Sequence, residues 1–382
     1  MRALRMRDIP GFGIDKVAEA AGSDPDVLRM ENLDTDLSPP PGVIEATREA
    51  LEQIEYSSWL PFSGRHDLKE AVADHVEDRS GVRYDPGSEI VIAATDGTSM
   101  LDALLAMCDP GDEVVLTDPT YAGMINRVRL AGAIPRFAAC RVQDGRWRLD
   151  LDSLRDSVTD KTKALFLQNA TFPTGMVLND EEWQAIVDLV LEKDLLLIYW
   201  GFMEGVVFEG APIIHPASFE GMRDRTITLG SVSIEYRMVG WRVAWAVAEP
   251  DTADALGVVH IYNGLVASGF CQAGAVAALR SDPQDFHDAV AELERRRNAV
   301  MEELDGLPVV SASGGWALLL DTQAMGISPP DASARLLKQK IAATPMTVWG
   351  EAVAPRYIRF VFSREPVERI RELGPRVRKA LT

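Results

Sequence analysis

The amino-acid sequence predicts an α/β protein with two domains: a large one built on a mostly parallel sheet, and a smaller α+β one. Three observations support this fold class. The chain has 382 residues, of which 47% are hydrophobic and 25% charged, the balance of a globular protein long enough for two cores. From Glu89 onward, short β-branched runs alternate with longer amphipathic stretches. After Leu279 this alternation gives way to a long charged helical pattern.

The predicted elements of the first two parts follow from apolar spacing. Residues 1–45 form an irregular, proline-containing arm that is expected to belong to the smaller domain. A helical pattern follows over 43–54, with apolar residues three and four apart. The large domain is predicted over 46–280, with strands at continuous apolar runs, which indicate a parallel sheet buried on both faces. These runs are 90–92, 113–116, 164–167, 195–198 and 226–229.

The smaller domain is predicted to continue over 281–382. It begins with the charged helical pattern through 289–303. Short strands are expected near Val309 and Ile358, and a closing helix over 367–381. The predicted small domain therefore combines helices with a few short strands.

Charge and composition exclude several classes of partner. The formal net charge of −19, without any Lys/Arg run, disfavours nucleic acid and anionic membranes. No apolar run reaches the roughly 18 to 20 residues that a bilayer span needs, and the N-terminus lacks a signal-peptide pattern. The three cysteines show no paired metal-ligand spacing, and no His/Cys metal cluster is found. We therefore expect a cytoplasmic protein without a metal, acting on a small molecule.

One turn has the character of an anion site. Residues 96–100 follow a predicted strand and open a helix over 101–107, so their free backbone N–H groups and small hydroxyls point toward an anion. An ordinary helix cap explains the same residues, because glycine, threonine and serine are common there. The turn alone leaves both interpretations open.

Later motifs resemble, in order, those of the class I/II aminotransferases, a pyridoxal-phosphate-dependent family of fold type I. The resemblance runs from about residue 30 to the C-terminus. It implies the fold type I architecture with a mostly parallel seven-stranded sheet, a role in amino acid metabolism and a homodimer. The matching segments are 108–114 with 118–121 ("DPGDEV…DPTY"), 169–175 ("NPxNPTG"), 230–234 with 240–242 ("GSFSK…GWR") and 357–360 (the late strand with a carboxylate-binding arginine).

Several polar groups of the family are retained. The resemblance assigns Tyr121 to stacking on the cofactor ring and Arg359 to the substrate carboxylate. It also implies a phosphate cradle made of Gly97, Thr98, Ser99, Ser231, Ser233 and Arg242. A planar guanidinium in a cleft favours a carboxylate or phosphate partner. A surface or interdomain ion pair is the alternative for both arginines.

Other positions depart from the family pattern. Ile234 stands where the family carries its Schiff-base lysine, and Trp200 where an acidic residue pairs with the pyridine nitrogen. Phe172 and Met203 replace the polar residues that contact the phenolic oxygen of the cofactor. The tyrosine lent across the dimer interface corresponds, less closely, to Trp59, which we expect to face a partner together with 267–269. These changes predict that the ring space is filled or reshaped, with the apolar side chains available to a substrate.

Catalytic candidates are then sought near the altered positions. Glu204 and Glu235 flank them, and a carboxylate beside Trp200 would have a raised pKa suited to a general acid or base. His66 lies near Gly64 in a loop that the family directs toward its site. Tyr121 is the fourth candidate. For the two glutamates, solvation or a salt bridge is the alternative, and for His66 a plain loop position.

Three hypotheses about function follow. The first is a repurposed enzyme with a degenerate pyridoxal site, acting without pyridoxal phosphate on a small amino-acid-like carboxylate. The second is a non-catalytic binding or regulatory pseudoenzyme, and the third an enzyme that binds pyridoxal phosphate non-covalently. We expect no covalently bound cofactor, and regard non-covalent pyridoxal phosphate as disfavoured, because Ile234 has no amine.

Overall fold

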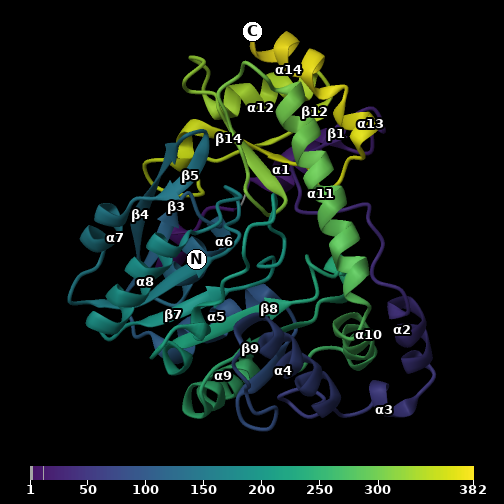
Figure 1. The fold of residues 1–382 in the computed structure, drawn as a ribbon, viewed down its shortest axis with the longest axis vertical. Helices are drawn as coiled ribbons and strands as arrows, with labels where there is room; N and C mark the ends of the chain where they lie inside the picture. Colours follow the sequence, from purple (N-terminus) through teal and green to yellow (C-terminus); the bar gives the residue numbers. More distant parts are fainter. Residues whose placement is uncertain (1–2, 12) are drawn as a thin grey trace.

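The larger of the two main sheets is mostly parallel. The computed structural model describes residues 3–11 and 13–382. Within them this sheet has eight strands, in the order β2-β9-β8-β7-β6-β3-β4-β5 (Figure 1). The inner pairs from β8 to β4 are parallel, whereas β9 is antiparallel to both β2 and β8, and β5 to β4. The bounds are β2 Ile90–Ala93, β3 Glu113–Asp118, β4 Ile134–Gln143, β5 Arg146–Leu149, β6 Thr162–Gln168, β7 Leu196–Trp200, β8 Thr226–Ser231 and β9 Ala244–Val247.

The strands form where the sequence has uninterrupted apolar runs. Every residue of β2, β3, β8 and β9 is buried, as expected for a sheet covered by helices on both faces. The predicted fold class is therefore confirmed. The eighth strand, β5, extends the edge as a hairpin on β4, through a turn in which Asp144 and Gly145 have φ of 50° and 73°. Two successive positive φ values are typical of a tight hairpin turn.

Helices cover the large sheet and connect its strands. Several of these helices have first turns capped by side chains: Asn179 and Glu182 form a capping box at the start of α8, and Thr95 accepts from the backbone N–H of Thr98 at the start of α5. The α-helices of this part are α2 Val43–Leu51, α3 Ile54–Ser57, α4 His66–Ser80, α5 Asp96–Met107, α6 Ala122–Leu130, α7 Leu151–Ser157, α8 Asp180–Glu192, α9 Pro250–Asn263 and α10 Gly269–Leu279.

A smaller antiparallel sheet has the order β10-β11-β14-β13. Beside it, β1 pairs in parallel with β12, so the N-terminal arm packs with the C-terminal part of the chain. The predicted limits near residues 45 and 280 stay a prediction. The strands are β1 Leu28–Arg29, β10 Val309–Val310, β11 Ala317–Asp321, β12 Ile341–Ala342, β13 Thr344–Pro345 and β14 Tyr357–Val361. The helices are α1 Ile14–Ala21, α11 Pro283–Glu303, α12 Pro329–Lys338, α13 Val367–Ile370 and α14 Leu373–Leu381. Short 3₁₀ helices are η1 Leu4–Asp8, η2 Pro216–Ser218, η3 Arg223–Arg225, η4 Val239–Trp241 and η5 Ala354–Arg356.

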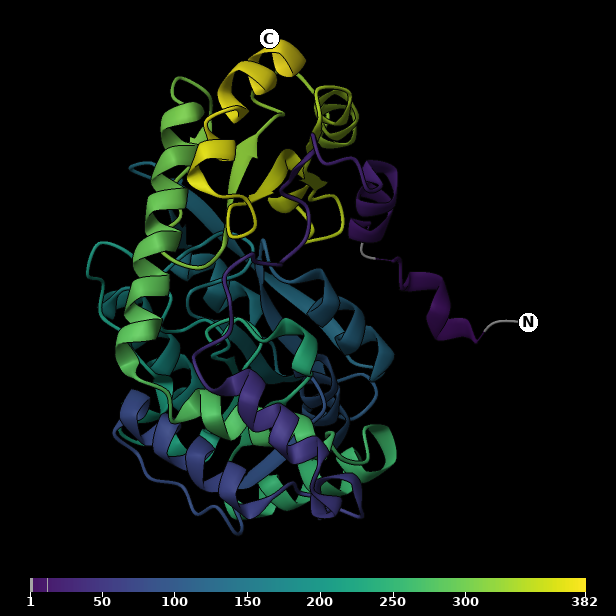
Figure 2. The ribbon, with the colours of Figure 1, turned by 90° about the vertical axis from the view of Figure 1, so that its right-hand side faces the viewer.

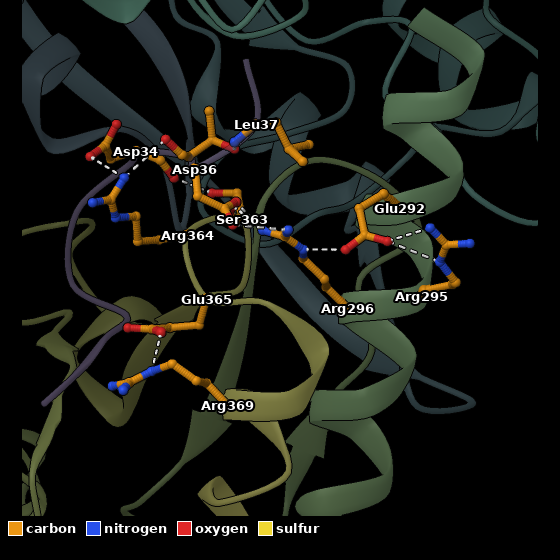
Figure 3. A network of polar contacts seen from close by, with 11 residues as sticks. Asp34, Asp36, Leu37, Glu292, Arg295, Arg296, Ser363, Arg364, Glu365 and Arg369 are labelled. Carbon is orange, nitrogen blue, oxygen red and sulfur yellow. Dashed lines mark hydrogen bonds and ion pairs between the residues drawn. The ribbon is translucent and has the colours of Figure 1, made fainter. Parts of the chain in front are cut away.

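Helix α11 runs along the molecule from its lower to its upper part (Figure 2). Its buried Arg296 joins three segments that are far apart in the sequence (Figure 3). The guanidinium donates to the Asp36 carboxylate at 2.6 Å, to the Ser363 carbonyl at 2.7 Å and to Glu292 at 2.7 Å. Ser363 in turn donates from its hydroxyl to the Asp34 carbonyl at 2.6 Å. This network fixes the N-terminal arm against α11.

None of the described helices combines the length and apolar character that a membrane-spanning helix needs.

Candidate functional site

A pocket of about 280 Å³ opens where several strands of the large sheet end. Tyr121 follows β3, Trp200 ends β7, and Ser233 and Ile234 follow β8. Ligand sites of open α/β sheets lie at this carboxyl edge. The wall comprises Ile14, Leu33, Thr95, Asp96, Gly97, Tyr121, Arg127, Phe172, Trp200, Phe202, Ser233, Ile234, Val239 and Arg242.

One side of the pocket is aromatic and apolar. Trp200 stacks on Phe202, with ring centroids 3.5 Å apart and planes 8° from parallel. Tyr121 lies 5.2 Å from Trp200 and 6.2 Å from Phe172, both at tilted angles. Ile234 is only 3% exposed. The structure thus brings together Tyr121, Phe172, Trp200 and Ile234 as predicted.

The opposite side is polar and includes an arginine that the sequence analysis missed. Arg127 on α6 donates from Nε to the Gly97 carbonyl at 2.7 Å and from Nη1 to the Gly123 carbonyl at 2.9 Å. Its guanidinium lies 6.0 Å from the centre of the Tyr121 ring. A Cβ on Gly97 would come within 2.2 Å of Nη2, so a side chain at position 97 would require the Arg127 guanidinium to shift. The sequence did contain a signal for Arg127: it stands six residues after Tyr121, on the helix that leads away from the sheet edge.

The predicted phosphate cradle is only partly in the pocket wall. Gly97, Ser233 and Arg242 line the pocket. Thr98 and Ser99 do not line the pocket. The Thr98 N–H donates to the Thr95 hydroxyl at 2.9 Å, and the Ser99 hydroxyl donates to the Asp96 carbonyl at 3.0 Å. These two hydroxyl residues therefore stabilise the start of α5.

The remaining cradle residues lie around the loop after β8. Ser231, which is buried, accepts from the Ser233 N–H at 3.3 Å and does not line the pocket. Arg242 has a left-handed backbone (φ 56°) and donates to the Val239 carbonyl at 2.6 Å. With this hydrogen bond to a nearby carbonyl, the guanidinium remains at the pocket wall.

Asp96 is a further residue that the sequence analysis did not single out. Burial raises the pKa of its carboxyl, while a hydrogen bond from Ser231 and the charges of Arg242 and Arg127 oppose that shift. Its buried Oδ1 has no hydrogen-bond partner among the described residues. A buried carboxyl with a raised pKa at this wall is a group that can donate or accept a proton in the pocket.

Arg359, the predicted carboxylate clamp, is fully buried behind the pocket wall. Its guanidinium lies 4.9 Å from the centre of the Phe172 ring and 4.5 Å from that of Trp349. Nη2 donates to the Glu31 carbonyl, whereas Nε and Nη1 have no hydrogen-bond partner among the described residues. Burial lowers the pKa of Arg359 to about 9. Phe172 lines the pocket and Arg359 does not, so its predicted role requires Phe172 to move aside.

Three other predicted residues lie outside the pocket wall. Met203 is buried and packs near Gly315. His66 is exposed and lies 3.4 Å from Glu70. Trp59 is 76% exposed and makes an edge contact with Phe62 at 5.2 Å between ring centroids. The roles assigned to these residues by resemblance stay predictions.

The two candidate glutamates form a buried cluster away from the pocket wall. Glu204 accepts from the Tyr199 hydroxyl at 2.9 Å. Glu235 accepts from the Gly205 N–H at 2.5 Å and pairs with Arg79 at 3.1 Å. Burial raises the pKa of Glu204 to about 8, because the charge of Arg79 only partly offsets desolvation. The sequence predicts a raised pKa for a carboxylate at this position. The structure places Glu204 in a cluster with the Glu235–Arg79 salt bridge, which is the alternative to a role as catalytic acid or base.

Glu204 should make the stability of the protein depend on pH. Its folded pKa of about 8 lies above its ordinary value of 4.5, so the folded state binds the proton more tightly. The contribution is complete below the ordinary pKa and is lost as the pH rises through the folded pKa. We expect the free energy of unfolding to fall by on the order of a few kcal/mol more in wild type than in Glu204→Gln between about pH 5 and 9.

Urea unfolding at a series of pH values measures this difference. Glu181→Gln, at an exposed position of α8, is the matched control and should retain the wild-type slope. Equal pH slopes for wild type and Glu204→Gln would show that Glu204 is ionised throughout.

Comparison with known proteins connects this geometry to a family. Residues 28–373 match the family model of aminotransferase class I and II. The aspartate aminotransferase of Pyrococcus abyssi is 28% identical over 373 residues, covering 96% of this chain and 95% of that protein. The aromatic-amino-acid aminotransferase 2 of Thermococcus litoralis is also 28% identical over 373 residues, covering 96% and 95%.

Solved structures show the same likeness. N-succinyldiaminopimelate aminotransferase from Mycobacterium tuberculosis superposes with a TM-score of 0.92 at 26% identity, over 98% of this chain and 100% of that one. Aspartate aminotransferase from Thermus thermophilus with maleate gives a TM-score of 0.91 at 25% identity, over 100% of both chains.

These relatives correct two expectations. The interpretation as an enzyme independent of pyridoxal phosphate, or as a regulatory pseudoenzyme with a degenerate site, is wrong, because the relatives across the whole chain are aminotransferases. The expectation that pyridoxal phosphate is absent or disfavoured is contradicted by the same relatives. Each apolar residue at an altered position changes one contact of the site. The pocket itself is retained, together with Tyr121, Arg127 and Arg242 in its wall. With the family model matched over residues 28–373, the chain belongs to the aminotransferase class I and II family.

Proposed function

We propose that the protein is an aminotransferase that exchanges an amino group between an amino acid and a keto acid, with pyridoxal phosphate as cofactor. The observation that carries this proposal is the pocket at the carboxyl edge of the sheet, where Tyr121 lies with Arg127 and Arg242. The relatives named for aspartate, aromatic amino acids and N-succinyldiaminopimelate support amino-acid-like carboxylates as the substrate class. A cytoplasmic location stays a prediction.

The residues present fit one end of the cofactor better than the other. Two guanidinium groups, from Arg127 and Arg242, face a single carboxylate, Asp96, so the polar wall carries net positive charge and fits a phosphate. At the other end, Trp200 has a buried indole N–H without a hydrogen-bond partner among the described residues. No lysine lines the pocket within the described part of the chain, and Ile234 offers no amine.

Pyridoxal phosphate, when bound, supplies the carbonyl that takes up an amino group and a ring that withdraws electrons. The chain would contribute positioning: Ser233 and Arg242 would hold the phosphate, and Tyr121 would orient the ring from one side. Trp200 stacked on Phe202 excludes water from the apolar wall. Asp96, whose pKa is raised by burial, would donate or accept a proton at its carboxyl.

Arg359 remains the proposed partner of the substrate carboxylate. A buried guanidinium whose Nε and Nη1 have no hydrogen-bond partner among the described residues is costly, and a substrate carboxylate that reached Nη1 would satisfy part of that donor capacity. Phe172 covers the guanidinium face at 4.9 Å, so a bound substrate must displace this ring. The position of Phe172 would then distinguish the free from the bound form.

Arg242→Ala tests the proposed cofactor site. Loss of a charge-assisted hydrogen bond of roughly 1.5–3 kcal/mol should weaken pyridoxal phosphate binding by about tenfold or more. Absorption spectra titrated with pyridoxal phosphate give the affinity. Amino transfer to 2-oxoglutarate from aspartate, phenylalanine or N-succinyldiaminopimelate gives the activity. Arg335→Ala, at an exposed position of α12, should behave as wild type.

Wild type should therefore show both a saturable spectral change and transfer from at least one donor. The proposal fails if wild type shows neither with pyridoxal phosphate present.

We further propose that the chain is a divergent member of its family, with Ile234 at the position of the lysine that bonds the cofactor. Residue 234 is buried and lines the pocket, so Ile234→Lys should place an amine beside the bound cofactor. Burial lowers a lysine pKa and keeps the amine neutral and nucleophilic. After pyridoxal phosphate and borohydride, mass spectrometry should find the reduced adduct on residue 234 in Ile234→Lys.

Ile234→Met, which has similar volume and no amine, is the control and should carry no adduct at this position. An adduct on other peptides of Ile234→Lys, with residue 234 unmodified, would refute the assignment of this position.

A homodimer is also proposed, on the basis of exposed apolar side chains. Ile54, Trp59 and Tyr262 are 83%, 76% and 89% exposed. Residues 54–60 and the segment around Gly269 lie against each other, since a Cβ on Gly269 would come within 2.1 Å of the Tyr56 carbonyl oxygen. Large apolar side chains that are exposed in this way are characteristic of protein interfaces. Trp59 and residues 267–269 are the positions predicted to face a partner.

Trp59→Glu combined with Tyr262→Glu should convert the dimer into a monomer in light scattering at micromolar concentration, because two charges would be buried at the interface. Leu191→Glu, on α8, adds a charge at another partly exposed apolar site and should leave the mass unchanged. A wild-type monomer would disprove the proposed dimer.

A further inference from the structure

A second cavity, of about 480 Å³, lies where the edge of the large sheet meets the small sheet. The hairpin of β4 and β5 forms one wall, and β10 with residues 352–357 forms the other. The hairpin turn contacts the small sheet directly, because the Ser311 N–H donates to the Gly145 carbonyl at 3.0 Å. The cavity shares no lining residue with the Tyr121 pocket. Its volume falls in the range of roughly 300–1,000 Å³ that small-molecule sites have.

The inner wall of this cavity suits a flat aromatic group. Trp147 and Tyr357, both buried, form an edge-to-face pair with ring centroids 5.1 Å apart. Cys140 and Val310 add buried apolar surface beside them. The Trp147 indole N–H is buried without a hydrogen-bond partner among the described residues, and an unsatisfied donor of this kind costs about 1–3 kcal/mol. A ligand with an acceptor atom next to its ring would satisfy that donor.

The outer wall favours a negative charge. Arg141 and Arg356 line the cavity together with one acidic residue, Asp321. Asp321 already pairs with Arg356 at 2.6 Å, whereas Arg141 has only a distant ion pair, at 3.9 Å, with Asp150. The cavity wall itself carries two guanidinium groups and one carboxylate, in a chain whose net charge is −19, and Arg141 is the less tightly paired of the two arginines. Arginine pairs well with carboxylates because its planar fork matches their geometry.

One wall of the cavity is connected to the Tyr121 pocket. Ala352 and Val353 line the cavity, and the N–H groups of residues 351–354 all donate to the buried Asp118 carboxylate, at 2.7–3.0 Å. Asp118 ends β3, three residues before Tyr121. The Thr120 N–H donates to the Trp349 carbonyl at 2.8 Å. A molecule that contacts residues 352 and 353 therefore acts on the same hydrogen-bonded unit that holds Tyr121.

We propose that this cavity is a regulatory site for a small aromatic carboxylate, whose binding changes the surroundings of Tyr121 through residues 349–354. The inference does not depend on the reaction catalysed in the Tyr121 pocket. It rests on the aromatic wall, the unpaired Trp147 donor, the two arginines and the Asp118 connection.

The probe for the test is 2-naphthoate, with uncharged 2-naphthamide as its partner. The indole N–H resonances of the ¹⁵N-labelled full chain, which has eight tryptophans, report on each region separately after assignment by Trp→Phe substitution. We expect 2-naphthoate to shift the Trp147 resonance saturably, and to shift the Trp349 resonance with the same midpoint. 2-Naphthamide should bind about tenfold or more weakly, since it lacks the charge.

A matched pair of variants localises the binding. Val142→Trp adds a large side chain at the partly exposed rim of the cavity, and should weaken 2-naphthoate binding by about tenfold or more. Leu191→Trp makes a similar change at a partly exposed position of α8 and should have no effect. A shift of Trp200 without Trp147 would place the probe in the Tyr121 pocket and overturn the proposal. A shift of Trp147 that leaves Trp349 unchanged would overturn the regulatory connection.

Discussion

The carboxylate of Asp118 is the contact on which the arrangement of the two sheets depends. It lies at the end of β3 and accepts four backbone N–H groups from residues 351–354. A hydrogen bond to a charged group contributes roughly 1.5–3 kcal/mol, and all four of these bonds would be lost with the carboxylate. A Cβ on Gly350 would come within 1.9 Å of Oδ1, so the close approach also requires glycine. The site aromatics Tyr121 and Trp349 lie on either side of this junction.

A second polar junction, at Arg296, connects separate segments on the other side of the molecule. It joins α11 to residues 34–36 and to Ser363, so that the N-terminal arm cannot shift independently of the long helix (Figure 3). Leu33, which lines the pocket, directly precedes the tethered residues. Two polar junctions, one on each side, thus set the shape of an otherwise apolar pocket. Buried ionic groups of this kind specify a geometry more than they add stability.

Much of the fold was predictable because buried parallel strands have an unmistakable apolar pattern. The runs at 113–116, 164–167 and 226–229 fall inside β3, β6 and β8. The strands β4, β5 and β9 were missed: β4 and β5, at the sheet edge, include many partly exposed residues, and β9 has only four residues.

The site was predicted less evenly. Tyr121, Phe172, Trp200 and Ile234 meet as expected, because each follows or ends a strand of the same sheet edge. The contributions of Ile14 and Arg127 depend on tertiary packing that local patterns do not encode. Glu204 shows that a residue close in sequence to Trp200 need not lie in the pocket. Neighbouring strand residues point to opposite faces, so Trp200 enters the pocket while Tyr199 turns toward Glu204.

The close approach of Arg127 to Gly97 has a consequence for how this chain can change over evolutionary time. Any side chain at position 97 would collide with the guanidinium that also covers Tyr121. A substitution at position 97 would therefore move the Arg127 guanidinium out of this conformation. A shorter residue 127 would open position 97 but would give up the bonds to two carbonyls of the pocket wall. Changes at the two positions are thus coupled: a substitution at either one alters the contact that the other makes with the pocket wall.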